Sequence, residues 1–117
     1  MPKDEAAIEA EIQAKKLNAP RLNPAHIDAQ IGQEYWGRAS DLFAKGPRSP
    51  ELECLTLYVM VLRNGFTIVG KSACASPANY DAELGRKIAR DDARNQIWAL
   101  EGYLLRSRLA DTAQNVG

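Results

Sequence analysis

Three arginines recur at intervals of four residues in the C-terminal part of the chain: Arg86, Arg90 and Arg94. This spacing is close to one turn of an α-helix, so it places their guanidinium groups in one row. A guanidinium group binds phosphate oxygens through paired hydrogen bonds, and the row therefore predicts an anion-binding site. The alternative interpretation is a solvated helix edge, on which Asp91 pairs with Lys87 or Arg94.

Further residues around this row favour a phosphate-bearing ligand. Residues 63–76 contain Arg63 and Lys71 but no acidic residue. Ser76-Pro77 predicts the start of a helix, and the first backbone N–H groups of a helix bind anions. Aromatic rings stack on nucleotide bases, although they more often pack in a core. We predict phosphate contacts from Lys71, Asn79, Arg86, Arg90 and Arg94, and base stacking on Phe66 or Tyr80.

Other kinds of chemistry find no matching residue pattern. His26 is the only histidine, and together with Cys54 and Cys74 it offers no zinc-ligand spacing. A Ser/His/Asp or Cys/His triad would need His26, which nothing in the sequence brings near a cysteine. The glycine-containing motifs of hydrolases and of nucleotide-binding enzymes are absent. We expect a protein that is not an enzyme and that uses neither a metal nor a cofactor.

Length and composition are those of one small globular domain. The chain has 117 residues, of which 45 % are hydrophobic. Its 15 Lys and Arg balance 15 Asp and Glu, so no net charge favours nucleic acid or an anionic membrane as a partner. No apolar run reaches the roughly 18 residues of a membrane span, and the charged start lacks the apolar core of a signal peptide. We expect a cytoplasmic protein with reduced cysteines.

Local signals predict two helices in the N-terminal part of the chain. Residues 4–17 carry acidic residues at the start and lysines at the end, as the helix dipole favours, and Pro20 lies just beyond them. Asn23 and Pro24 are typical of the N-cap and first residue of a second helix. An apolar stripe continues this second helix as far as Gly37: Ile27, Ile31 and Tyr35. The alternative is a further turn beyond Gly37, carried by Ala39, Leu42 and Phe43.

The strongest local signal is a β-hairpin. Two runs rich in β-branched and aromatic residues, Leu55–Leu62 and Phe66–Cys74, flank Asn64-Gly65, which predicts a turn with positive φ at both residues. A two-residue turn pairs Leu55 with Cys74, so Cys54 and Cys74 point to opposite faces and stay free thiols. In this register the core face holds Leu55, Leu57, Val59, Val61, Phe66 and Ile68, and the other face holds Tyr58, Met60, Leu62, Thr67, Val69 and Lys71.

A long C-terminal helix follows, with Ser76 as its cap and a broad apolar band at helical spacing. The fold class is therefore α+β: two N-terminal helices, a central antiparallel β-hairpin and a long C-terminal helix packed on the sheet. The predicted divisions are an N-terminal helical extension over residues 1–17, a single α+β domain over residues 18–109 and a frayed tail over residues 110–117. Apolar residues on both strand faces, together with exposed strand edges, predict a homo-oligomer.

Several motifs occur together in the order of a known family. NAPRLNPAHIDAQI at residues 18–31 and LRNGFTIVGKSACASPANYDAELGRKIARDDARNQIWALEGYLL at residues 62–105 resemble a family of small tailed-phage proteins, labelled by gene products forty-nine and sixty-six of two phages. The resemblance covers residues 17–109, and the loop at residues 44–49 departs from the pattern. It implies a phage or prophage protein of the bacterial cytoplasm and supplies no mechanism.

The size and layout are also similar to those of the Thoeris-blocking signal sponges of phages. That resemblance concerns architecture and residue types, and it implies an oligomeric, non-enzymatic protein that sequesters a cyclic nucleotide immune signal. Sequestration of such a phosphate-bearing signal is our leading hypothesis. The alternatives are a minor structural protein of the phage particle and a protein–protein adaptor or host-takeover protein, whose docking surface would be the sheet face with Tyr58, Met60, Leu62 and Val69.

Overall fold

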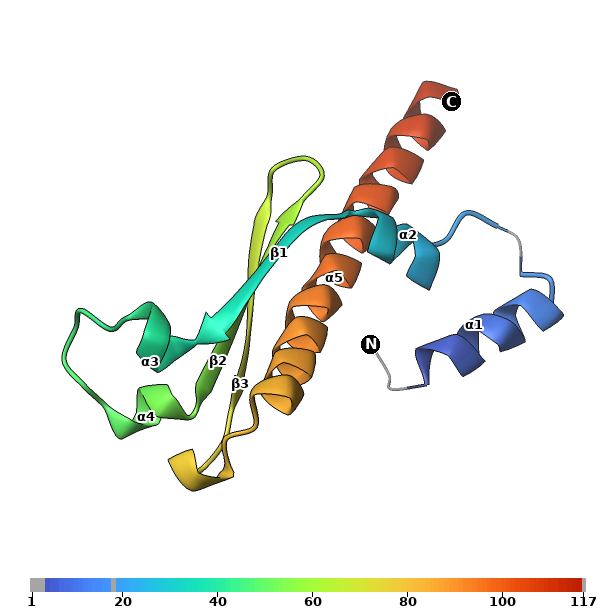
Figure 1. Ribbon diagram of the computed structural model, residues 1–117. Coiled ribbons are helices and arrows are strands. Elements are labelled where there is room, and N and C mark those ends of the chain that lie inside the picture. Colours follow the sequence, from blue (N-terminus) through green and yellow to red (C-terminus); the bar gives the residue numbers. More distant parts are fainter. Residues whose placement is uncertain (1–3, 18, 117) are drawn as a thin grey trace. The chain divides into compact units, whose positions relative to one another are not determined.

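The computed structural model describes residues 4–17 and 19–116, and its fold class is α+β, as predicted (Figure 1). The elements in chain order are α1 (Glu5–Ala14), α2 (Pro24–Ala29), β1 (Ile31–Arg38), α3 (Ala39–Leu42), α4 (Pro50–Glu53), β2 (Leu55–Leu62), β3 (Thr67–Ala73), the 3-10 helix η1 (Pro77–Asn79) and α5 (Ala82–Val116). In the part of the chain that the structure describes, no helix is both long and apolar enough to cross a membrane.

The described chain divides into two compact units. One contains α1, α2 and the part of α5 from Asn95 onward, and the other extends from Ile31 to Arg94. The second unit is a three-stranded antiparallel sheet in the order β1-β2-β3, and the first part of α5 packs on one of its faces (Figure 1). Gly70 on β3 meets Ala89 and Ala93 of α5 at close range, so small residues set the distance between helix and sheet.

The first strand, β1, replaces most of the predicted second helix. Asn23 is the cap of α2, as predicted: its Oδ1 accepts a hydrogen bond from the backbone N–H of His26 at 2.8 Å. The helix then ends at Ala29, and the predicted extension to Gly37 is wrong, because Ile31–Arg38 pairs with β2. The stripe of Ile27, Ile31 and Tyr35 fits a helix, but pairing with a neighbouring strand satisfies the backbone of this segment instead.

The hairpin is confirmed, but its register differs from the prediction by one residue. The backbone N–H of Leu62 donates to the carbonyl of Phe66 at 2.8 Å, which leaves a turn of three residues between them. Gly65 has a φ of 90°, whereas Asn64 does not have positive φ. The Asn64 side chain instead accepts a hydrogen bond from the N–H of Phe66. A three-residue turn with glycine in the left-handed region therefore pairs Leu55 with Ala73, not with Cys74.

This register reverses the predicted faces of β2. The buried side chains of the hairpin are Thr56, Tyr58, Met60, Leu62 and Ile68. The predicted core residues of β2 are only half-buried: Leu55, Leu57, Val59 and Val61. Phe66 is exposed at the end of the hairpin. The adaptor surface predicted from Tyr58, Met60 and Leu62 is therefore wrong, since those side chains form the core.

The register also corrects the prediction for the cysteines. Cys74 donates its backbone N–H to the carbonyl of Cys54 at 3.0 Å, so the two residues lie directly opposite each other. The prediction that they point to opposite faces is therefore wrong, although both are free thiols, as expected.

The long helix begins later and ends later than predicted. Ser76 and Pro77 start η1 and not α5. The cap of α5 is Asp81, whose Oδ1 accepts a hydrogen bond from the N–H of Leu84 at 3.0 Å. The helix continues to Val116, beyond the predicted boundary at residue 109. The sequence predicts anion binding by the backbone N–H groups of residues 76–79 at the start of a long helix, but these residues precede α5.

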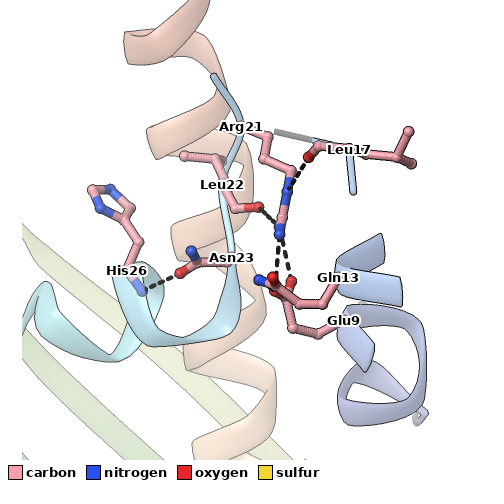
Figure 2. Close-up of polar contacts among 7 residues, drawn as sticks. All are labelled: Glu9, Gln13, Leu17, Arg21, Leu22, Asn23 and His26. Atoms are coloured by element: carbon pink, nitrogen blue, oxygen red, sulfur yellow. Dashed lines mark hydrogen bonds and ion pairs between the residues drawn. The ribbon is translucent and has the colours of Figure 1, made fainter. Parts of the chain in front are cut away.

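In the other unit, an ion pair ties α1 to the segment that precedes α2. Figure 2 shows the Arg21 guanidinium group reaching the Glu9 carboxylate, with Nη1 and Nη2 at 2.8 and 2.9 Å from its two oxygens. The carbonyl groups of Leu17 and Leu22 accept further hydrogen bonds from the same guanidinium group. Hydrogen bonds from Arg21 and Gln13 lower the pKa of Glu9 to about 2. This paired geometry positions α1 within its unit.

Candidate ligand-binding site

Three side chains of β1 lie on the sheet face that α5 packs against. Glu34, Trp36 and Arg38 are paired with buried residues of β2, and successive strand residues alternate between faces. Arg90 of α5 reaches this row: its Nε lies 2.7 Å from Glu34 Oε1. The Tyr58 hydroxyl donates to the same carboxylate oxygen at 2.6 Å. The Glu34 carboxylate therefore connects β1 to Arg90 of α5 and to Tyr58 of β2.

The polar network around Glu34 keeps its carboxylate charged. Burial raises the pKa of Glu34, but hydrogen bonds from Tyr58 and Arg90 outweigh that effect and hold the pKa below its ordinary value. Burial, followed by the hydrogen bond to Glu34, raises the pKa of Tyr58. The network therefore consists of a charged carboxylate, a charged guanidinium group and a neutral phenol. Its members satisfy one another, so its main effect is to position β1 against α5.

Trp36 is the most prominent aromatic group beside this network. Its ring stacks on that of Tyr58, with centroids 5.6 Å apart and an angle of 9° between the planes. The Arg86 guanidinium carbon lies 5.1 Å from the Trp36 ring centroid. The Trp36 side chain is nevertheless 51 % exposed, although its stacking partner Tyr58 is buried. A large aromatic surface and a cation are therefore presented to solvent together.

A second cation–aromatic pair lies next to the first. The Arg38 guanidinium carbon lies 3.9 Å from the Tyr80 ring centroid, and Arg38 Nε donates to the Glu53 carbonyl at 2.6 Å. Trp36 and Arg38 are two residues apart on the same face of β1, which corresponds to about 7 Å along a strand. We call the set formed by Trp36, Arg38, Tyr80 and Arg86 the arginine–aromatic cluster.

The charges in this region favour an anionic ligand. Arg38, Arg86 and Arg90 bring three guanidinium groups to this face, and Glu34 brings one carboxylate, which Arg90 already pairs. Arg38 and Arg86 contact aromatic rings. Guanidinium groups bind phosphate oxygens, and both guanidinium planes and aromatic rings stack on nucleotide bases. These residue types are the ones that contact phosphate groups and planar rings in other proteins.

The structure brings only some of the predicted site residues together. Arg86 and Tyr80 belong to the arginine–aromatic cluster, and Arg90 lies beside it in the ion pair with Glu34. Arg94 is half-buried one helical turn further along α5. The row of arginines thus contributes Arg90 to an ion pair with β1 and Arg86 to a cation–aromatic contact.

The other predicted contacts lie elsewhere in the fold. Lys71 follows the buried Gly70 on β3. Because successive strand residues face opposite sides, the Lys71 side chain projects from the sheet face that α5 does not cover. Phe66 is exposed beside the hairpin turn, and Asn79 is an exposed residue of η1. The structure therefore does not bring Lys71 together with Arg86.

Sequence reasoning missed the contribution of β1. The predicted second helix includes Glu34 and Trp36 and ends at Gly37, just before Arg38, so it gives these three residues no shared face. Their spacing of two residues is the signal that could have placed them together on a strand. The helical spacing of Arg86, Arg90 and Arg94 gives no indication that Arg86 contacts Trp36.

A separate concavity lies in the connection between β1 and β2. A cavity of about 450 Å³ is bounded by α3, the loop after it and α4, and its lining includes Phe43, Arg48 and Glu53. Figure 1 shows α3 and α4 side by side at the end of the sheet. None of its lining residues belongs to the arginine–aromatic cluster. The two are connected only through Glu53, which lines the cavity and whose carbonyl group accepts the hydrogen bond from Arg38 Nε.

Comparison with protein-family models matches residues 22–109 to the family described as phage protein (N4 Gp49/phage Sf6 gene 66). The matched segment contains α2, all three strands and α5 as far as residue 109. Neither a search of curated proteins nor a search of solved structures found a match to the chain.

Proposed function

The chain belongs to the N4 Gp49/phage Sf6 gene 66 family of phage proteins, and from this premise we propose that it binds a small phosphate-bearing nucleotide without turning it over. The observation that carries the proposal is the arginine–aromatic cluster, in which Arg38 and Arg86 each lie over an aromatic ring on one face of the sheet. Phosphate groups would contact the guanidinium groups, and the base would stack beside Trp36 or Tyr80.

Binding without turnover follows from the residue types in the cluster. Arginine has no proton to release near neutral pH, and Glu34 is charged and already paired with Arg90 and Tyr58. Such a set suits the stabilisation of a bound anion, and its guanidinium groups are poorly suited to general acid or base catalysis. A phage protein with this property would act by lowering the free concentration of its ligand. We propose a cyclic nucleotide immune signal of the host as that ligand.

A thermal-shift panel on the purified chain tests this proposal. The ligands are cyclic ADP-ribose isomers, cyclic dinucleotides and trinucleotides, and the linear nucleotide that matches each. A ligand at 100 times its dissociation constant stabilises the folded state by about 2.7 kcal/mol, which moves the unfolding temperature by several degrees. We expect a shift with a cyclic ligand that its linear counterpart does not reproduce. A panel without any shift would contradict the proposal.

Matched variants locate the ligand. Arg38→Gln and Arg86→Gln remove charge from the cluster while keeping polar side chains of similar length, and each should weaken binding by at least tenfold. Lys71→Gln removes an exposed cation from the opposite sheet face and should leave the affinity unchanged. Trp36 fluorescence, recorded in a Trp98→Phe background, reports occupancy directly. Equal losses in Lys71→Gln and Arg86→Gln would show that the effect is not local to the cluster.

A second candidate function, protein–protein contact, rests on the other face of the sheet. Tyr35 and Val69 there are 55 % and 54 % exposed, and Leu57, Val59 and Val61 beside them are half-buried. We call these five residues the open sheet face. Exposed apolar groups on one continuous surface are typical of interaction sites. The face would serve either a second copy of this chain or a host protein, and it takes the place of the predicted docking surface, whose residues Tyr58, Met60 and Leu62 are buried.

Self-association and capture experiments distinguish these roles. Light scattering on the purified chain should report a mass above that of one chain, and Tyr35→Asp or Val69→Asp should return it to one chain. Tyr103→Asp, at an exposed position in the other unit, is the control. A host protein captured by the wild type and lost only with the two open-face variants would instead support the adaptor. A monomer that captures no partner would contradict both.

A further inference from the structure

Cys54 and Cys74 occupy opposite positions at the open end of the hairpin. The hydrogen bond from the Cys74 N–H to the Cys54 carbonyl continues the ladder beyond the Leu55–Ala73 pair. The bond between Leu62 and Phe66 belongs to the same register, so the cysteines fall at a hydrogen-bonded position. The Cα atoms of such a pair are about 5.5 Å apart. Disulfides join Cα atoms that are about 4.4–6.8 Å apart, and the Cα spacing of such a pair falls within this range.

Each thiol group donates to a carbonyl group near this pair: Cys54 Sγ lies 3.6 Å from the Pro50 oxygen, and Cys74 Sγ lies 3.2 Å from the Ser76 oxygen. Cys74 Sγ lies 3.6 Å from the carbonyl oxygen of Cys54, which places it over its partner residue. Cys54 is 7 % exposed, whereas Cys74 is half-buried and is therefore the more exposed of the two. Burial, followed by the neighbouring Cys74 thiol, raises the pKa of Cys54. Cys74 is therefore the sulfur that reacts first with an external oxidant.

We propose that Cys54 and Cys74 are a modification site that forms a reversible intramolecular disulfide with low-molecular-weight disulfides as the oxidant. The Cys74 thiolate attacks one sulfur of the oxidant, forms a mixed disulfide and displaces the first small thiol. The Cys54 thiolate then attacks Cys74 Sγ and displaces the second small thiol. The two protons lost by the protein thiols appear on the two released thiols. The protein pair is oxidised by two electrons and the small disulfide is reduced by two.

The disulfide would join two connecting segments of the same unit, one between α4 and β2 and the other between β3 and η1. Cys54 directly follows α4, and Cys74 lies three residues before η1. Glu53, next to Cys54, provides the carbonyl group that holds Arg38 Nε. Closing the disulfide therefore limits movement of the segment that anchors Arg38. This consequence concerns the mobility of the segment, and the disulfide itself does not depend on the proposed ligand.

Oxidised glutathione, applied to the full chain without denaturant, tests the proposal. We expect both free thiols to disappear, the mass of one chain to fall by that of two hydrogen atoms, and a reducing agent to restore both. The urea midpoint should rise in the oxidised form because the crosslink restricts the unfolded chain. Persistence of two thiols in excess oxidised glutathione would overturn the proposal. So would a stable glutathione adduct on Cys74 or crosslinking only between chains.

A control variant with two thiols separates geometry from cysteine content. The double variant Cys54→Ala and Leu55→Cys keeps two thiols but moves one to the opposite strand face, where no closure is expected. Circular dichroism confirms that each variant is folded before oxidation. Cys74→Ser should leave one thiol and no intramolecular bond. Closure in the shifted variant at the wild-type rate would show that the opposed positions do not determine the reaction.

Discussion

Gly70 on β3 lies directly against Ala89 on α5. A Cβ atom at Gly70 would be 2.3 Å from the carbonyl oxygen of Ala89, a distance that no side chain can occupy without movement of the helix. The contact fixes how closely α5 approaches the sheet. It also determines that the side chains of β1 on this face, rather than those of β3, remain accessible beside the helix.

Gly70→Ala should therefore destabilise the protein strongly. Because the clash involves helix backbone, repacking cannot relieve it, and we expect a loss of about 2 kcal/mol or more in the free energy of unfolding by urea. Lys71→Thr, at the other neighbouring position, which is also exposed, is the control and should change little. An unchanged urea midpoint in Gly70→Ala would contradict the close packing of α5.

Removing the Tyr58 hydroxyl should weaken the network at Glu34. In Tyr58→Phe the ring can still stack on Trp36, but Glu34 loses a hydrogen bond of 2.6 Å. A hydrogen bond to a charged group contributes about 1.5 to 3 kcal/mol, so the free energy of unfolding should fall by that amount. Tyr103→Phe, at an exposed position, should have no measurable effect. Equal stability of the two variants would show that the Glu34 contact is not formed in solution.

The contribution of Glu34 should depend on pH. Its pKa in the folded protein is held below the ordinary value of 4.5, so the folded state favours the charged form. The resulting stability is present above the unfolded pKa and is lost as pH falls through the folded pKa. Urea unfolding of wild type and Glu34→Gln should therefore differ most near pH 7 and converge at acidic pH. A difference that grows on acidification would show that the sign is wrong.

The ion pair between Glu9 and Arg21 should be visible in a titration. The pKa of Glu9 is lowered to about 2, mainly by its hydrogen bond from Arg21. Carboxyl chemical shifts measured by NMR should give a midpoint near that value in wild type. Arg21→Gln should raise the midpoint toward 4.5, whereas Lys15→Gln, which removes an exposed cation near the same helix, should not. A wild-type midpoint near 4.5 would mean that α1 is not held by this contact.

Substitutions in the hairpin turn should distinguish the three-residue turn from the two-residue turn that the sequence predicts. Gly65 has positive φ and Asn64 does not, so Gly65→Ala should cost about 1 to 2 kcal/mol. Asn64→Gly should also destabilise the hairpin, because it removes the hydrogen bond to Phe66 and adds freedom to the unfolded chain. A two-residue turn with positive φ at both positions would tolerate Asn64→Gly without loss. Urea unfolding of both variants provides the measurement.

Local signals in the sequence were sufficient to predict the kinds of element and their order in most of the chain. Asn23 followed by proline marks the start of α2, and Asn64-Gly65 between two β-rich runs marks the hairpin. These signals act through the backbone preferences of a few neighbouring residues, so they do not depend on the rest of the fold. The α+β class and the family resemblance followed from the same local motifs.

Tertiary structure decided which residues face the core and which meet at the candidate site. Ile31–Arg38 has apolar residues at helical spacing, but a neighbouring strand pairs with its backbone and makes it β1. One extra residue in the turn exchanges the faces of β2, buries Tyr58 and sets Cys54 opposite Cys74. Side chains alternate with a period of two, so a register shift of one residue reverses every side chain of a strand. Such a shift depends on long-range packing, which no local pattern records.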